Sequence, residues 1–170
     1  MKVFEAGHEE SVRVWLDQGF EKAAERALLA TGNRLVATIQ NEIIPKEEPK
    51  PVDRGIYRAA WRAKKIKGGA EVYNTAPHAV FIEYGVRAQN VKIGPAMINA
   101  LEQWVMRKGI ASKKEARSVA YAIAMSMKKK GIFNRGGRGG LRILDKALDR
   151  LGDFLNKEFQ VEIRREFEKR

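Results

Sequence analysis

The segment WRAKKIKGGAEVYNT, residues 61–75, indicates whether the chain is wholly helical or contains both helices and strands. Two glycines, Gly68 and Gly69, separate Trp61–Lys67 from Ala70–Thr75. A glycine pair at this place is typical of a two-residue turn, because glycine adopts the positive φ angles that tight hairpins need. We therefore predict a β-hairpin near 61–75. The expected fold class is α+β, with a long N-terminal helix, a small antiparallel β-sheet including this hairpin, and three further helices.

The residues before this segment predict a long helix. From Asp17 onward, apolar residues recur at steps of three and four and leave one apolar stripe. This stripe comprises Phe20, Ala24, Ala27, Leu28, Leu35, Ile39 and Ile43. Asp17 is expected to cap the helix and Pro45 to end it, while Gly32 in its interior should weaken it by up to about 1 kcal/mol. The apolar alternation around Gly7 predicts a small hairpin before the helix.

Two helices are predicted after residue 90 from their start and stop signals. Pro95 suits the first turn of one helix, and Gly109 suits its C-terminal end. Ser112 and Glu115 have the spacing of a capping box for the next helix, which Gly131 should end. This second helix carries a ridge of small residues that would let a neighbouring helix approach closely: Ala116, Ala120 and Ala124.

The ends of the predicted domain are less regular. Three prolines and alternating charges predict a mobile loop near 45–52. A last helix should begin near Leu141 and carry leucines on one face as far as Leu155. We expect one α+β domain over 1–150, while 151–170 could continue the last helix or leave it as a tail. The loop and the tail are both polar and could become ordered on assembly.

The positive charge is concentrated in one part of the chain. The formal net charge is +12, and residues 107–150 hold 13 basic and 3 acidic residues. Such a block predicts a polyanionic neighbour, either nucleic acid or an acidic protein surface, although a solvated face is the simpler alternative. The residues expected to face DNA or a partner stand at the end of the second helix and in the glycine-rich loop after it: Lys128, Lys129, Lys130, Arg135 and Arg138.

The sequence offers little for catalysis or for a cofactor. It has no cysteine, and its two histidines, His8 and His78, lie far apart without the spacing of metal ligands. The loop GIFNRGGRGG at 131–140 lacks the G-K-[ST] of a phosphate-binding loop and is more simply a connection between helices. We expect no metal, no cofactor and no enzymatic activity. The alternative is a hydrolase that uses His78 with Glu83. No apolar run approaches the roughly 20 residues of a membrane helix, so no membrane partner is expected.

The segment PHAVFIEYGV, residues 77–86, predicts a short buried helix that serves as a structural joint. It is entered through Pro77 and left through Gly85. Glu83 stands in apolar company and needs a partner, most simply a basic residue of its own or a neighbouring chain. The residues assigned to the joint are Pro77, Phe81, Glu83, Tyr84 and Gly85.

These residues also carry a resemblance. The run PVDRGIYRAAWRAKKIKGGAEVYNTAPHAVFIEYG, residues 51–85, resembles the signature P-V-D-T-G-x-L-x-x-S-W … V-x-N-T-A-P-Y-A-x-x-V-E-Y-G-T of a protein family found in tailed bacteriophages. Its members are head–tail joining proteins: neck, tail-completion or minor tail components. IGPAMINALEQWVMRKGI and EARSVAYAIAMSMKKKGI are similar to its later segments, so the resemblance covers roughly residues 45 to 150. His78 replaces the usual tyrosine, Arg54 replaces a threonine, and NRGGRGGLRIL replaces a proline-aromatic stretch.

The resemblance implies a non-enzymatic virion protein of the phage neck. It would join the head connector to the tail as an oligomeric ring around the DNA channel, expected to be a hexamer because tail tubes have that symmetry. Its partners would be further copies of itself, the connector or head-closure proteins, the tail-terminator or tail-tube proteins, and genome DNA bound without sequence specificity. The protein would be found in the virion neck, and in the host cytoplasm during assembly. The alternative is a free basic DNA- or RNA-binding protein.

Overall fold

The computed structural model describes residues 6–47, 54–132 and 139–168, with side chains from residue 19 onward. The chain divides into two compact units. The helix–hairpin unit contains Met1–Ile43, Trp61–Asn74 and Asp145–Arg170. The multi-helix unit contains Ile44–Ala60 and Thr75–Leu144. The mixed α+β class is confirmed, because a long N-terminal helix, an antiparallel hairpin and several further helices are present. The domain boundary at residue 150 stays a prediction.

Helix α1, Ala6–Thr38, is longer than its apolar stripe predicted. The predicted hairpin around Gly7 is wrong, because the helix already includes that residue, and Asp17 lies inside the helix instead of capping it. The helix continues through a π-turn, Ile39–Ile43, into a 3₁₀ turn, Ile44–Lys46, that contains Pro45. The α-helix proper thus ends at Thr38, and Pro45, which lacks the N–H group that a further turn would need, lies in the last turn of the helical run.

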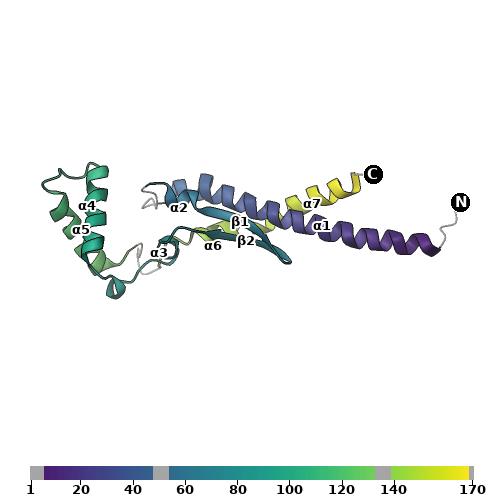
Figure 1. Ribbon diagram of the computed structural model, residues 1–170, viewed down its shortest axis with the longest axis horizontal. Coiled ribbons are helices and arrows are strands. Elements are labelled where there is room, and N and C mark those ends of the chain that lie inside the picture. Colours follow the sequence, from purple (N-terminus) through teal and green to yellow (C-terminus); the bar gives the residue numbers. More distant parts are fainter. Residues whose placement is uncertain (1–5, 48–53, 133–138, 169–170) are drawn as a thin grey trace. The chain divides into compact units, whose positions relative to one another are not determined.

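The hairpin consists of β1, Trp61–Ile66, and β2, Gly69–Asn74, and its two strands form the whole sheet in the described part of the chain. Ile66 pairs with Gly69, so the turn residues are Lys67 and Gly68 instead of the predicted Gly68 and Gly69. Gly68 has a φ of 73°, which explains the need for glycine there. In Figure 1 the hairpin lies along α1.

Gly32 permits the close approach of α1 and the hairpin. A Cβ atom at this position would lie 3.3 Å from the Cβ of Ala63 and 3.5 Å from side-chain atoms of Ala70 and Val72. Gly32 lowers the helix propensity of α1, but its missing side chain lets the hairpin pack closely on the helix. The burial of the hairpin offsets the cost in helix propensity.

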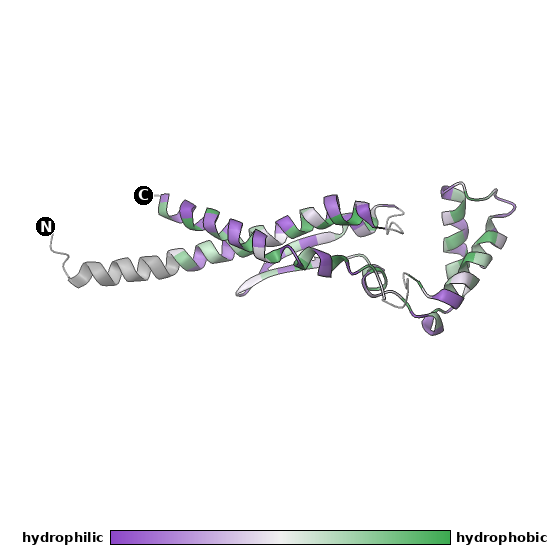
Figure 2. Cartoon of the chain, turned by 180° about the vertical axis from the view of Figure 1, so that it is seen from behind, coloured by the Kyte–Doolittle hydropathy of each residue, from purple (hydrophilic) through white to green (hydrophobic). Residues whose placement is uncertain are grey.

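Helix α7, Leu151–Glu168, packs along α1. The last leucine-rich helix was predicted as one element, but α6, Ile143–Leu148, ends before α7 begins. The C-terminal segment was expected to be either a continuation of the last helix or a tail, and its described residues form the helix α7. Figure 2 shows hydrophilic and hydrophobic residues in turn around α7, as expected for a helix packed on one side only.

The seam between α1 and α7 is held partly by ion pairs. The carboxylate of Glu162 is nearly buried and accepts a 2.6 Å hydrogen bond from Nε of Arg26, which also donates to Glu166 at 2.5 Å. The hydrogen bond from Arg26 holds the pKa of Glu162 below its usual value, against the opposing effect of burial. Arg34 pairs with Glu158 at 2.9 Å. Because α7 depends on these charges, its docking should respond to pH.

Besides the 3₁₀ turn Ile44–Lys46, the described part of the multi-helix unit contains elements with these bounds: α2, Ile56–Ala59; α3, Ala79–Tyr84; the 3₁₀ turn η3, Ala88–Asn90; α4, Pro95–Arg107; and α5, Ala116–Lys130. Pro95 begins α4, and Gly109 and Gly131 follow the two long helices with φ angles of 64° and 84°, as predicted. The predicted ridge of Ala116, Ala120 and Ala124 is fully buried where α5 packs on α4. In the described part of the chain, no helix combines the length and apolar character needed to cross a membrane.

Candidate interaction site on helix α3

Helix α3 presents an apolar face to solvent. Its buried residues are Ala79 and Ile82. Three larger side chains stand on the other side: Val80 is 62% exposed, Phe81 is 53% exposed and Tyr84 is 59% exposed. Exposed apolar side chains that lie next to one another are typical of an interaction surface. The prediction of a buried helix is therefore only half correct.

The carboxylate of Glu83 links α3 to two other residues through hydrogen bonds. The hydroxyl of Tyr57, which is 1% exposed, donates a 2.6 Å hydrogen bond to Oε1 of Glu83. The backbone N–H of Leu144 donates to Oε2 at 3.2 Å. The sequence predicted a basic partner for Glu83, but a phenol and a peptide group fill that place. Such donors satisfy a half-buried carboxylate without adding a second desolvated charge.

The segment before α6 fixes the end of α3 through the backbone. The N–H of Leu141 donates to the carbonyl of Ile82 at 2.8 Å, and the N–H of Arg142 donates to the carbonyl of Glu83 at 3.2 Å. Gly140 makes this approach possible, since a Cβ atom there would lie 1.7 Å from the carbonyl oxygen of Glu83. Gly139 is also close, with an added Cβ 2.9 Å from the Tyr84 carbonyl oxygen.

Arg142 completes this support. It adopts a φ of 51°, which is strained for a residue with a side chain, and its guanidinium carbon lies 5.4 Å from the centre of the Tyr84 ring. A cation over a tyrosine ring is favourable and limits the motion of both groups. The exposed face of α3 is therefore held in one position by contacts from two separate parts of the chain, Tyr57 and residues 139–144.

The predicted joint residues lie together on this element. Pro77 is exposed one residue before His78, the N-terminal cap residue of α3. Gly85 follows with a φ of 68°, and its N–H donates to the carbonyl of Phe81 at 2.9 Å. His78 is exposed, and its ring lies 6.3 Å from the ring of Tyr57. The role of the five residues as a structural joint stays a prediction.

The predicted basic residues are described only in part. Lys128, Lys129 and Lys130 are exposed in the last turn of α5, where the helix dipole favours cations. Arg135 and Arg138 lie outside the described residues. The structure brings the three lysines to one helix end, and their contact with DNA or an acidic partner stays a prediction.

Sequence reasoning missed the residues that support α3. The sequence assigns no supporting role to Tyr57, Arg142 or the pair Gly139–Gly140, and it predicts these glycines only as part of the loop 131–140. Two adjacent glycines can indicate close backbone approach, and this was the available signal. Within the ranges that the structure describes, no group of three or more histidine, aspartate or glutamate side chains is placed to hold a metal ion.

These features define a class: an α+β protein with an exposed apolar face on a short helix that is fixed by contacts from other parts of the chain. Residues 9–85, just under half of the chain, match the family HK97-gp10-like, described as "Bacteriophage HK97-gp10, putative tail-component". The matched part includes α3 and ends at Gly85. The match supports a tailed-phage head–tail or tail protein family, so the resemblance seen in the sequence is confirmed. The chain has no significant match among curated proteins or solved structures.

Proposed function

We propose that this phage tail component is a structural protein of the neck, which completes the tail and joins it to the head connector. In this proposal it acts as a homo-oligomeric ring, a hexamer, around the DNA channel, and it makes and breaks no covalent bond. The exposed face of α3 is the observation that carries the proposal. This face lies inside the part of the chain that matches the tail-component family.

The physical properties of the face suit an interface between proteins. Phe81 and Tyr84 are aromatic, and aromatic side chains on a rigid support are the usual energetic centres of interfaces. Because Glu83 and the backbone of residues 139–144 already hold α3, binding would cost little additional ordering of the chain. A ring needs a contact between two different surfaces of neighbouring copies, and the α3 face would supply one of them.

The basic end of α5 supports the position at the channel. Lys128, Lys129 and Lys130 would face either the passing DNA or an acidic surface of an adjoining ring, and contact with DNA would be independent of sequence because it involves phosphates. The other partners in this proposal are the connector or head-closure protein and the tail-terminator or tail-tube protein. The protein would reside in the virion neck after assembly in the host cytoplasm.

The oligomeric state of the purified chain tests this proposal. Light scattering after size-exclusion chromatography, with negative-stain electron microscopy, should show a ring in the absence of nucleic acid. The double variant Phe81→Ser/Tyr84→Ser should yield folded monomers. The matched control Tyr121→Ser, at a site on α5 that is 56% exposed, should leave the ring intact. A wild-type protein that stays monomeric and binds DNA would instead favour the free DNA- or RNA-binding alternative.

A further inference from the structure

The β1–β2 hairpin has one face toward α1 and one face toward solvent. Ala63, Ala70 and Val72 face α1, because they surround the space where a side chain at Gly32 would lie. Side chains alternate along a strand, so the residues between them point the other way. The outward face therefore carries Arg62, Lys64 and Ile66 from β1, and Glu71 and Tyr73 from β2.

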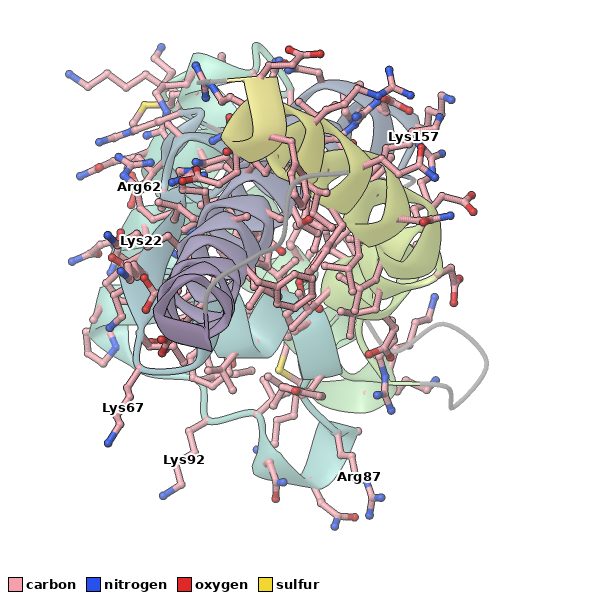
Figure 3. All side chains as sticks on the ribbon, turned by 90° about the vertical axis from the view of Figure 1, so that its right-hand side faces the viewer. Lys22, Arg62, Lys67, Arg87, Lys92 and Lys157 are labelled. Atoms are coloured by element: carbon pink, nitrogen blue, oxygen red, sulfur yellow. The ribbon has the colours of Figure 1, made fainter. Side chains whose placement is uncertain are left out.

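Cations gather on this face and at the turn. Arg62 and Lys64 are exposed on β1, and Lys67 is exposed in the turn. Lys65, on the other side of β1, reaches Glu25 of α1 at 2.5 Å. Lys22 is exposed on α1 about one helical turn before Glu25, the residue that Lys65 of the hairpin reaches. Figure 3 shows Lys22, Arg62 and Lys67 directed outward from the ribbon on the same side of the view.

The spacing of these charges suits a phosphate backbone. A strand rises about 3.4 Å per residue, so the attachment points of Arg62 and Lys64 are roughly 7 Å apart along β1. Lys64 Nζ lies 4.9 Å from the centre of the Tyr73 ring, on the strand opposite. The Tyr73 ring is partly exposed, and an aromatic ring beside a cation can pack against the sugars of the nucleic-acid backbone. A two-stranded ribbon also has the width that the major groove of duplex DNA admits.

We propose that the outward face of the hairpin is a nucleic-acid contact surface, in which Arg62, Lys64, Lys67 and Lys22 bind the phosphates of duplex DNA. Binding is independent of sequence, because the contacts go to the backbone. This surface belongs to the helix–hairpin unit and is distinct from the basic end of α5. It goes beyond the proposed neck function and needs no ring, since the residues come from one chain.

The salt dependence of DNA binding by the full-length chain tests the proposal. Fluorescence anisotropy with a labelled 30-base-pair duplex, over a series of NaCl concentrations, gives the slope of log K against log [NaCl]. Each lost phosphate contact lowers the magnitude of this slope by about 0.9. The double variant Arg62→Ala/Lys67→Ala should lower it by about two. The matched control Lys92→Ala/Lys157→Ala removes the same charge from exposed sites off the hairpin and should leave it unchanged.

A second variant acts in the opposite direction and so cannot be explained by misfolding. Glu71 forms an ion pair with Lys64, with 2.9 Å between Oε2 and Nζ, and it places a negative charge on the outward face. Glu71→Gln should free Lys64 for DNA, strengthen binding and increase the slope by up to about one. Equal slopes for the hairpin and control variants, unchanged binding by Glu71→Gln, or wild-type binding only to an acidic protein and not to the duplex would each overturn the proposal. None of these results bears on ring formation.

Discussion

Replacing Gly140 by alanine should destabilise the multi-helix unit far more than an ordinary glycine substitution. Gly140 has a φ of 65°, in the left-handed region where a residue with a side chain is disfavoured by about 1–2 kcal/mol. The new Cβ would lie 1.7 Å from the carbonyl oxygen of Glu83, whereas such atoms normally stay about 3.3 Å apart. The two segments must therefore separate by more than 1 Å.

The size of the effect follows from the contacts that this separation breaks. Two backbone hydrogen bonds join the segments, from Leu141 and Arg142 to the carbonyls of Ile82 and Glu83. Each contributes about 0.5–1.5 kcal/mol. Together with the backbone strain, Gly140→Ala should lower the free energy of unfolding by about 2–5 kcal/mol.

Gly109 provides a matched control in the same unit. Its φ is 64°, but a Cβ atom there would meet nothing within 4 Å, so Gly109→Ala should cost only about 1–2 kcal/mol. Urea unfolding followed by circular dichroism measures both variants, and amide hydrogen exchange at residues 139–144 reports the local opening. If Gly140→Ala costs no more than Gly109→Ala, the close packing of this segment on α3 is refuted.

Three further predictions concern the supports of the fold. Tyr57→Phe removes the hydroxyl donor of Glu83 and should lower the free energy of unfolding by about 1–3 kcal/mol in urea titrations; no change would show that water replaces the phenol. The pKa of Glu162 is depressed by Arg26, so its stabilising effect is present above the unfolded value of about 4.3 and is lost as the pH falls through the lower folded value. Acid titration should therefore loosen α7, and Glu162→Gln should flatten that pH dependence; an unchanged profile would contradict it. Gly32→Val should force the hairpin from α1 and cost about 2 kcal/mol or more in thermal unfolding, because overpacking a tight contact displaces backbone; wild-type stability would refute the close approach.

The sequence predicted the elements that have strong local signals. Pro95, Gly109 and Gly131 marked the ends of two helices, and the alanine ridge identified the buried side of α5. These signals succeeded because proline and glycine act on the backbone of their own segment. By contrast, the first turns of α1 were predicted as a hairpin, since a short apolar alternation fits either state until the length of the helix is known.

Other features depend on partners far away in the sequence. The turn could lie at Lys67–Gly68 or at Gly68–Gly69 from local chemistry alone. Packing of the hairpin on α1 at Gly32 selects the turn at Lys67–Gly68, because a shift of the strand register by one residue would change every cross-strand pair. The partner of Glu83 was equally hidden, since Tyr57 and Leu144 are brought to it only by the fold. Sequence reasoning located the candidate site but not what holds it in place.

The proposed function makes the chain a structural part of the phage neck. Immunogold labelling of purified mature particles, with mass spectrometry of the same preparation, tests it most directly. If the chain is a neck protein, it is present in mature particles and the label is confined to the junction of head and tail. Absence of the protein from mature particles, or label along the tail away from this junction, would contradict it.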